Sequence, residues 1–127
     1  MIELLRRLDA AGLPFVVVDH AARTDLQTAC RQHGLTLCIE FGEWSMARLI
    51  DALTGINPVF RLRPQPAPIP RDPAELASRR RLFLQTDLGK LDLIDEVPPV
   101  GGFFAAFARS HTTDHLGWPV NVLARSR

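Results

Sequence analysis

The sequence predicts a single domain of the α/β (α+β) class, with a mixed β-sheet and helices mainly on one of its faces. The first observation is a series of short apolar runs, such as "FVVVD" at 15–19, that are typical of buried strands. The second is that these runs alternate with stretches whose apolar residues recur at helical spacing. The third is the length of 127 residues, which suits one compact domain, residues 1–127, without a repeat.

Helices and strands alternate in the first half of the chain. We expect a helix from Ile2 to the "AGLP" of 11–14, a strand at 15–19, a helix at 21–33 and a strand at 35–41. Gly34 ends the second helix, because glycine commonly follows the last helical turn. A third helix should stop at Gly55, and its apolar stripe consists of Met46, Leu49, Ile50 and Leu53.

Alternation and prolines mark the middle of the chain. In "PVFRLR" (58–63), Phe60 and Leu62 should share one face of a strand, and Arg61 and Arg63 the other. Residues 64–73 form a Pro-rich loop within the domain, because proline stands at every second position from 64 to 70. A short helix then starts, with Asp72 as its N-cap and proline at its first position.

The second half predicts two hairpins and a helix. "RLFLQT" and "KLDLID" flank "DLGK", in which Gly89 supplies the turn. A helix around 103–109 follows, with Phe104 and Phe107 as expected core residues. The end of the chain, "TTDHLGWPVNVLARSR", should form a second hairpin that turns at Leu116–Gly117. Its two histidines are then strand residues, too far apart to share a metal ion.

Composition limits which binding partners and which cellular compartment the sequence predicts. The net charge of +1 gives no general attraction to nucleic acid or to anionic membranes. No apolar run approaches the roughly 20 residues of a membrane span, and the amphipathic start of the chain is unlike a secretory leader. Cys30 and Cys38 lack the spacing of a disulfide framework. We therefore expect a cytoplasmic protein with reduced thiols and no membrane partner.

Asp92 is unexpected, because it places a charge between Leu91 and Leu93 in a stretch that otherwise reads as a buried strand. In the strand that contains it, Leu91 and Leu93 point one way and Asp92 the other, so the carboxylate faces the side of the sheet away from the helices. A carboxylate in that place serves as a metal ligand or general base in one interpretation. In the other it pairs with an arginine of a neighbouring strand, Arg61 or Arg63.

Two segments carry a resemblance to a known family. With "LLRRLDAAGLPFVVVD" at the start and "RLFLQTDLGKLDLIDEVPPVGGF" later, the chain resembles small bacterial proteins of the nucleotidyltransferase (polymerase-β-like) fold. The similarity is most specific at 84–102. In active members, two aspartates on one strand and a third on a neighbouring strand hold two Mg²⁺ ions, which bind the triphosphate. A Gly-Gly or Gly-Ser turn lets backbone N–H groups approach the phosphates.

The match to this pattern is incomplete. Asp92 aligns with the third carboxylate, but Asp19 and His20 stand where the glycine pair belongs. Where the paired aspartates belong, one alignment places Thr36 and Cys38 and the other Cys38 and Glu40. If the chain is active, the resemblance implies Asp92 and Glu40 as catalytic and Mg²⁺-binding residues. It likewise implies four nucleotide-contacting positions, which are Asp19, His20, Arg61 and Arg63.

Three functions follow as hypotheses. The first is a nucleotidyltransferase-fold protein that has lost nucleotidyl transfer and has a binding or interaction role, as a homo-oligomer or beside a partner protein, with no cofactor expected. The second is a Mg²⁺-dependent nucleotidyltransferase with the altered acid set of Glu40 and Asp92. The third is a nucleic-acid-binding module that uses an arginine edge, formed by residues 79–81 with Arg61, Arg63 and Arg71.

Overall fold

The computed structural model describes residues 2–19, 34–62, 64–65, 67–115 and 118–124. The helix expected at 21–33, together with His20 and Arg63, lies outside the described residues. The described helices are α1 (Ile2–Ala10), α3 (Glu43–Leu53), α4 (Pro73–Ala77) and α5 (Phe103–Arg109). They accompany a mixed sheet, so the predicted α+β class is confirmed.

Within the described residues the main sheet has eight strands in the order β4-β3-β5-β6-β2-β1-β10-β9. Their bounds are β1 Val16–Asp19, β2 Leu35–Cys38, β3 Val59–Phe60, β4 Ala67–Pro68, β5 Arg81–Thr86, β6 Gly89–Ile94, β9 His111–His115 and β10 Trp118–Ala124. The β1–β10 and β2–β6 pairs are parallel, and the other pairs are antiparallel. Two short strands, β7 (Glu96–Val97) and β8 (Gly101–Gly102), pair separately.

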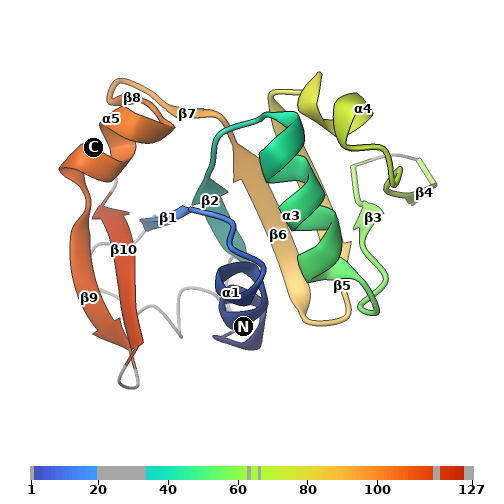
Figure 1. Ribbon diagram of the computed structural model, residues 1–127, viewed down its shortest axis with the longest axis horizontal. Helices are drawn as coiled ribbons and strands as arrows, with labels where there is room; N and C mark the ends of the chain where they lie inside the picture. The colour runs from blue at the N-terminus through green and yellow to red at the C-terminus, as the bar shows by residue number, and fades with distance from the viewer. Residues whose placement is uncertain (1, 20–33, 63, 66, 116–117, 125–127) are drawn as a thin grey trace.

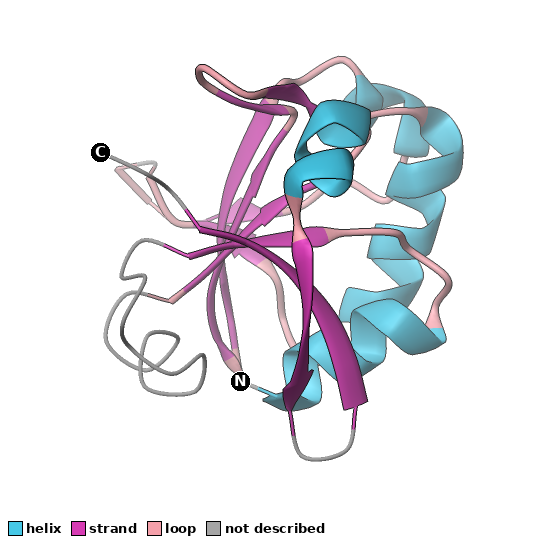
Figure 2. Cartoon of the chain, turned by 90° about the vertical axis from the view of Figure 1, so that its left-hand side faces the viewer, coloured by secondary structure: helices cyan, strands magenta, loops and turns pink. Residues whose placement is uncertain are grey.

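The helices α1, α3 and α4 gather on one side of the twisted sheet. In Figure 1, α3 lies in front of β6. The helix α1 lies to the lower left of α3, and α4 lies beside α3 at the upper right. Figure 2 shows α1, α3 and α4 to the right of the sheet, with β9 and β10 in the foreground and α5 above them. Burial explains the arrangement, because the leucines of α1 and α3 belong to the same buried cluster as Leu91 and Leu93 of β6.

A second, smaller cluster lies under α5. Val17 of β1 belongs to the large core, whereas Val16 and Val18 belong to the small one, so both faces of this strand are buried. From α5 the small cluster receives buried Ala106 and half-buried Phe103. The strand "FVVVD" is therefore apolar at consecutive positions because it separates two cores.

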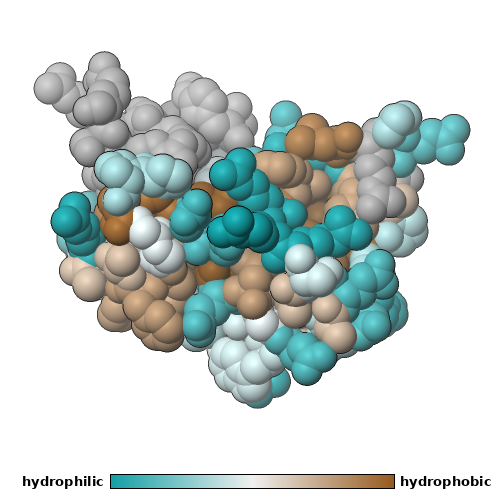
Figure 3. All heavy atoms as spheres, turned by 90° about the horizontal axis from the view of Figure 1, so that it is seen from above, coloured by the Kyte–Doolittle hydropathy of each residue, from teal (hydrophilic) through white to brown (hydrophobic). Residues whose placement is uncertain are grey.

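The side of α5 that faces the protein differs from the predicted one. Phe104 and Phe107 were expected in the core, and that prediction is wrong, since their side chains are 69% and 50% exposed. The sequence "FFAAFAR" is apolar on every side, so its periodicity does not select a buried face. Small Ala106 fits closely against β1, which leaves two phenyl rings on the surface. Figure 3 shows apolar side chains at its left, where α5 lies in Figure 1.

The segment around β3 is shorter than the predicted strand. β3 contains only Val59 and Phe60, and Leu62 is 67% exposed, so Leu62 does not share the buried face of Phe60. Within the Pro-rich loop, β4 pairs with β3 in antiparallel fashion and forms one edge of the sheet. The extended conformation predicted for the loop is thus confirmed at Ala67–Pro68.

Local signals at turns and helix ends agree with the structure. The N-cap prediction is confirmed, because the Asp72 carboxylate accepts a hydrogen bond from the Ala74 N–H at 3.1 Å. The hairpin of β5 and β6 turns at Asp87–Leu88, and Gly89 directly after this turn has a φ of 126°. At its C-terminal end, α3 has no basic residue of its own in the last turn. Arg7 of α1 instead donates hydrogen bonds to the carbonyl oxygens of Ala52 and Thr54.

Candidate functional site

Asp92 lies in the middle of β6, between two other strands of the sheet. Its Cα partners are Phe83 on the antiparallel β5 and Thr36 on the parallel β2. The neighbouring Leu91 and Leu93 are fully buried in the large core. The predicted direction of Asp92 is therefore confirmed: its side chain projects from the opposite side, where it is 21% exposed.

Arg61 binds the Asp92 carboxylate through both terminal nitrogens of its guanidinium group. Nη1 donates to Oδ1, and Nη2 donates to Oδ2 at 3.1 Å. Such a bidentate pair of charge-assisted hydrogen bonds is stronger than a hydrogen bond between neutral groups and fixes the orientation of both side chains. Of the two interpretations of Asp92, the pairing with Arg61 is thus confirmed.

Several contacts of β5 position the Arg61 side chain. The Arg61 backbone N–H donates to the Phe83 carbonyl at 3.0 Å, so the residue continues the β3–β5 pairing by one position. Nη1 also donates to the Leu84 carbonyl at 3.3 Å. The guanidinium carbon lies 5.6 Å from the centroid of the Phe83 ring, within the range of a cation–π contact. Arg61 is therefore fixed by two strands as well as by its charge partner.

The ion pair determines what Asp92 can bind. Both carboxylate oxygens face a cation that is itself only 22% exposed. A divalent cation at this carboxylate would have to displace the guanidinium and would be repelled by it at close range. The geometry favours a structural ion pair over an open metal ligand.

The position opposite Asp92 carries a hydroxyl group. Thr36 and Asp92 are Cα partners, so their side chains project on the same side of the sheet. Residue 36 is the first paired-acid position in one of the two alignments to the family pattern. A neutral threonine there supplies no charge to hold Mg²⁺.

The second alignment brings no further acid to Asp92. Cys38 is the Cα partner of Ile94, and Glu40 lies exposed beyond the end of β2. Thr36, and not Glu40, is the residue of β2 paired with Asp92, and Glu40 stands two residues after the strand ends at Cys38. The described parts of the chain contain no group of three histidine, cysteine, aspartate or glutamate residues that could hold a metal ion. The pairing of Glu40 with Asp92 therefore gains no support from the strand register and stays a prediction.

The thiol of Cys38 has low reactivity at this position. The residue is fully buried between β1 and β6. Burial raises the pKa of its thiol from 9.0 to about 11, and the negative charges of Asp95 and Glu96 add to that effect. The thiol therefore stays protonated near neutral pH and is a poor metal ligand and nucleophile.

The arginines of the expected basic edge contact different groups in the protein. Arg79 lies over the ring of Phe60, with its guanidinium carbon 4.8 Å from the ring centroid. Arg80 donates from Nε to the Asp95 carboxylate at 3.1 Å. With Arg61 bound to Asp92, three arginines of the proposed edge are engaged in different places. The described residues thus give little support to a continuous basic surface.

Two remaining candidates are only partly described. Asp19 ends β1, where its Cα is paired with that of Ala124 on β10. The predicted strand at "HTTDH" is confirmed as β9, on which His111 is exposed. His111 and His115 are four strand residues apart, which places them about 13 Å from each other along β9.

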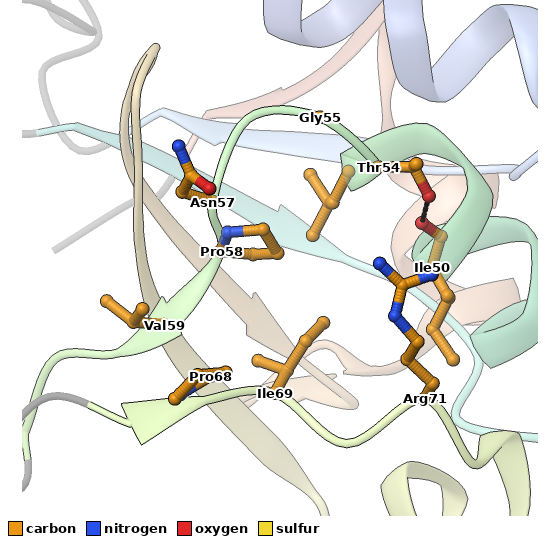
Figure 4. Close-up of a pocket in the computed structure, with 10 residues that line it drawn as sticks. Ile50, Thr54, Gly55, Asn57, Pro58, Val59, Pro68, Ile69 and Arg71 are labelled. Atoms are coloured by element: carbon orange, nitrogen blue, oxygen red, sulfur yellow. Dashed lines mark hydrogen bonds between the residues drawn. The ribbon is translucent and has the colours of Figure 1, made fainter.

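A pocket that the sequence did not indicate lies at the β4 edge of the sheet. It has a volume of about 220 Å³ and opens between the C-terminal end of α3 and the β3–β4 pair (Figure 4). The nearest sequence signals are Gly55 and Asn57, which adopt positive φ values of 92° and 52° and turn the chain from α3 into β3. Those signals predict a turn and say nothing about a hollow behind it.

Comparison with protein-family models, with curated proteins and with solved structures gives no match for this chain. None of the described helices is long and apolar enough to cross a membrane. The fold and the site thus define a class of protein: an α+β domain whose mid-sheet carboxylate is closed by an arginine.

Proposed function

We propose that this chain is a nucleotidyltransferase-fold protein without nucleotidyl transfer, and that it has a binding or interaction role. The Arg61–Asp92 ion pair carries the proposal. In the pattern that the sequence resembles, Asp92 corresponds to a carboxylate that holds Mg²⁺, whereas here its two oxygens accept hydrogen bonds from a guanidinium group. A positive charge fixed at this position opposes the binding of two further cations.

The surroundings of the ion pair support the same proposal. Two-metal transfer needs several carboxylates that converge on the reacting phosphate. Thr36 is the nearest cross-strand neighbour of Asp92 on β2, and Glu40 lies beyond the end of that strand. Arg61 also interacts with the Phe83 ring and the Leu84 carbonyl, so several contacts must be lost before the carboxylate is released.

Calorimetric titration of the purified protein with ATP and Mg²⁺ tests the missing transfer chemistry. We expect no Mg²⁺-dependent binding for the natural chain. Labelled nucleotides with candidate acceptors should likewise give no transfer product. Mg²⁺-dependent binding or transfer that Asp92→Ala abolishes and Arg81→Ala leaves intact would refute the proposal, because Arg81 is an exposed arginine outside the ion pair.

The interaction role has support from a different surface. Phe104 and Phe107 expose their rings on α5, and exposed apolar clusters are commonly covered in complexes. Sedimentation of the natural chain and of Phe104→Ser tests self-association. Leu62→Ser is a matched control, because Leu62 is exposed to nearly the same degree. A natural chain that stays monomeric at high concentration would exclude the homo-oligomer and leave a partner protein as the proposed form of this role.

A further inference from the structure

The pocket at the β4 edge combines apolar walls with a single charge. Ile50 and Leu53 of α3 form one wall, and Pro58, Val59 and Ile69 form the other. Figure 4 shows Ile50, Pro58 and Ile69 around the hollow, with the Arg71 guanidinium group directed toward Thr54. Of the described residues that line the pocket, Arg71 alone carries a charge.

The other polar side chains at the rim already have partners within the protein. The Thr54 hydroxyl donates to the Ile50 carbonyl at 2.8 Å. The Asn57 amide donates to the Asp87 carboxylate, also at 2.8 Å. Among the described residues, by contrast, Arg71 makes neither a hydrogen bond nor an ion pair. Its donors are therefore available to a ligand.

Arg71 is not needed to bind the carbonyl groups at the C-terminal end of α3, because another arginine binds them. The last carbonyl groups of a helix attract cations, which would be the ordinary reason for an arginine in this place. Arg7 approaches from α1 and donates to the carbonyl oxygens of Ala52 and Thr54. The guanidinium of Arg71 thus remains beside the apolar walls without that task.

We propose that this pocket binds a small apolar carboxylate, with the hydrocarbon part between α3 and β3 and the carboxylate on Arg71. A planar guanidinium group matches a carboxylate through two parallel hydrogen bonds. The volume of about 220 Å³ is below that of ordinary drug-sized sites. It suits a single aromatic ring or a short branched chain with its acid group.

The neighbouring strand argues against an extended peptide as the occupant. β4 is an edge strand, and a peptide would add to it through backbone hydrogen bonds. Pro68 within β4, with Pro64 and Pro70 on either side of it, has no N–H group to donate. A free small molecule needs no such donors.

Chemical-shift mapping with 3-phenylpropionate and its neutral amide, 3-phenylpropanamide, tests the site on the natural chain. We expect the acid to shift the signals of Leu53, Val59 and Ile69 at millimolar concentration, as a ligand of about ten non-hydrogen atoms should. The amide should bind about tenfold more weakly, because it cannot form the charged pair with Arg71.

Three variants make the test specific. Arg71→Gln should weaken binding of the acid about tenfold and leave the amide within about twofold of its value in the natural chain. Ile69→Trp should abolish both, because it fills the hollow, and Arg81→Gln should change neither. The proposal is overturned if no pocket signal moves, if acid and amide bind equally, or if Arg71→Gln leaves the acid unaffected. Asp92 and Arg61 take no part in this test, so its outcome is independent of the proposed function.

Discussion

Gly34 approaches Lys90 so closely that a Cβ atom at position 34 would lie 2.7 Å from the Lys90 Cβ. The contact lies where β2 begins to pair with β6, one residue before the Leu35–Leu91 partners. Gly34 also has a φ of 77°, a conformation that costs other residues free energy. Two independent constraints therefore require glycine at this position.

Gly34→Ala should lower the free energy of unfolding by about 2–3 kcal/mol, since it adds a steric clash to an unfavourable φ. Gly55→Ala is the matched control, because Gly55 has a φ of 92° and no atom lies within 4 Å of the position that an added Cβ would take. The control should cost only about 1 kcal/mol. Urea denaturation of both variants measures the difference, and equal losses would show that the contact with Lys90 is unimportant.

The Arg61–Asp92 pair should give a measurable coupling energy. Both side chains are about one-fifth exposed, so water screens them less than an ordinary surface pair. A double-mutant cycle with Arg61→Ala and Asp92→Ala should report about 1–2 kcal/mol. The same cycle at Arg80 and Asp95 should report no coupling, because Arg80 is 77% exposed. Additive effects at Arg61 and Asp92 would contradict the strong pair described above.

Stability should fall in alkaline solution because of Cys38. Its pKa is raised from 9.0 to about 11 in the folded protein, so the folded state retains a proton that the unfolded state loses. The stabilisation is fully present below about pH 9 and is lost as the pH rises toward about 11. Denaturation at a series of pH values, in a Cys30→Ser background, should show this slope. Cys38→Ala should flatten it, and an unchanged slope would assign the effect to other groups.

Substitutions in α5 should separate its buried side from its exposed side. Ala106→Leu should destabilise the domain by about 1–3 kcal/mol, because it overfills the small core beside Val16 and Leu123. Phe104→Ser should change the free energy of unfolding by less than about 0.5 kcal/mol in dilute protein. Thermal denaturation of the two variants checks this order. The reverse order would indicate that the phenyl ring, and not Ala106, belongs to the core.

Local sequence signals predicted most of the elements that the structure describes. The Asp72 cap, the Gly89 turn and the alternation around Asp92 depend on a few neighbouring residues, so they can be recognised without knowledge of distant parts of the chain. The pairing of Asp92 with an arginine was one of two alternatives, and Arg61 was one of two candidates. Only the β3–β5–β6 arrangement selects between them.

The predictions that the structure does not confirm concern contacts between distant segments, which local sequence patterns do not determine. Phe104 and Phe107 are exposed because α5 is apolar all round and tertiary packing selects Ala106. The pairing of Glu40 with Asp92 stays a prediction, because the β2–β6 register, which no local pattern encodes, places Thr36 beside Asp92. The pocket beside Arg71 depends on the approach of β4 to α3, between segments with no common motif.

The parallel partnership of β1 with β10 has a consequence for synthesis of the protein. Val17 emerges early from the ribosome, whereas its partner Val122 is added much later. Until then one side of β1 lacks its backbone partner, and the valines that will form two cores stay incompletely covered. Folding of this sheet is therefore expected to finish after translation has passed residue 124, with the nascent chain depending on chaperones for longer than a domain built from local hairpins.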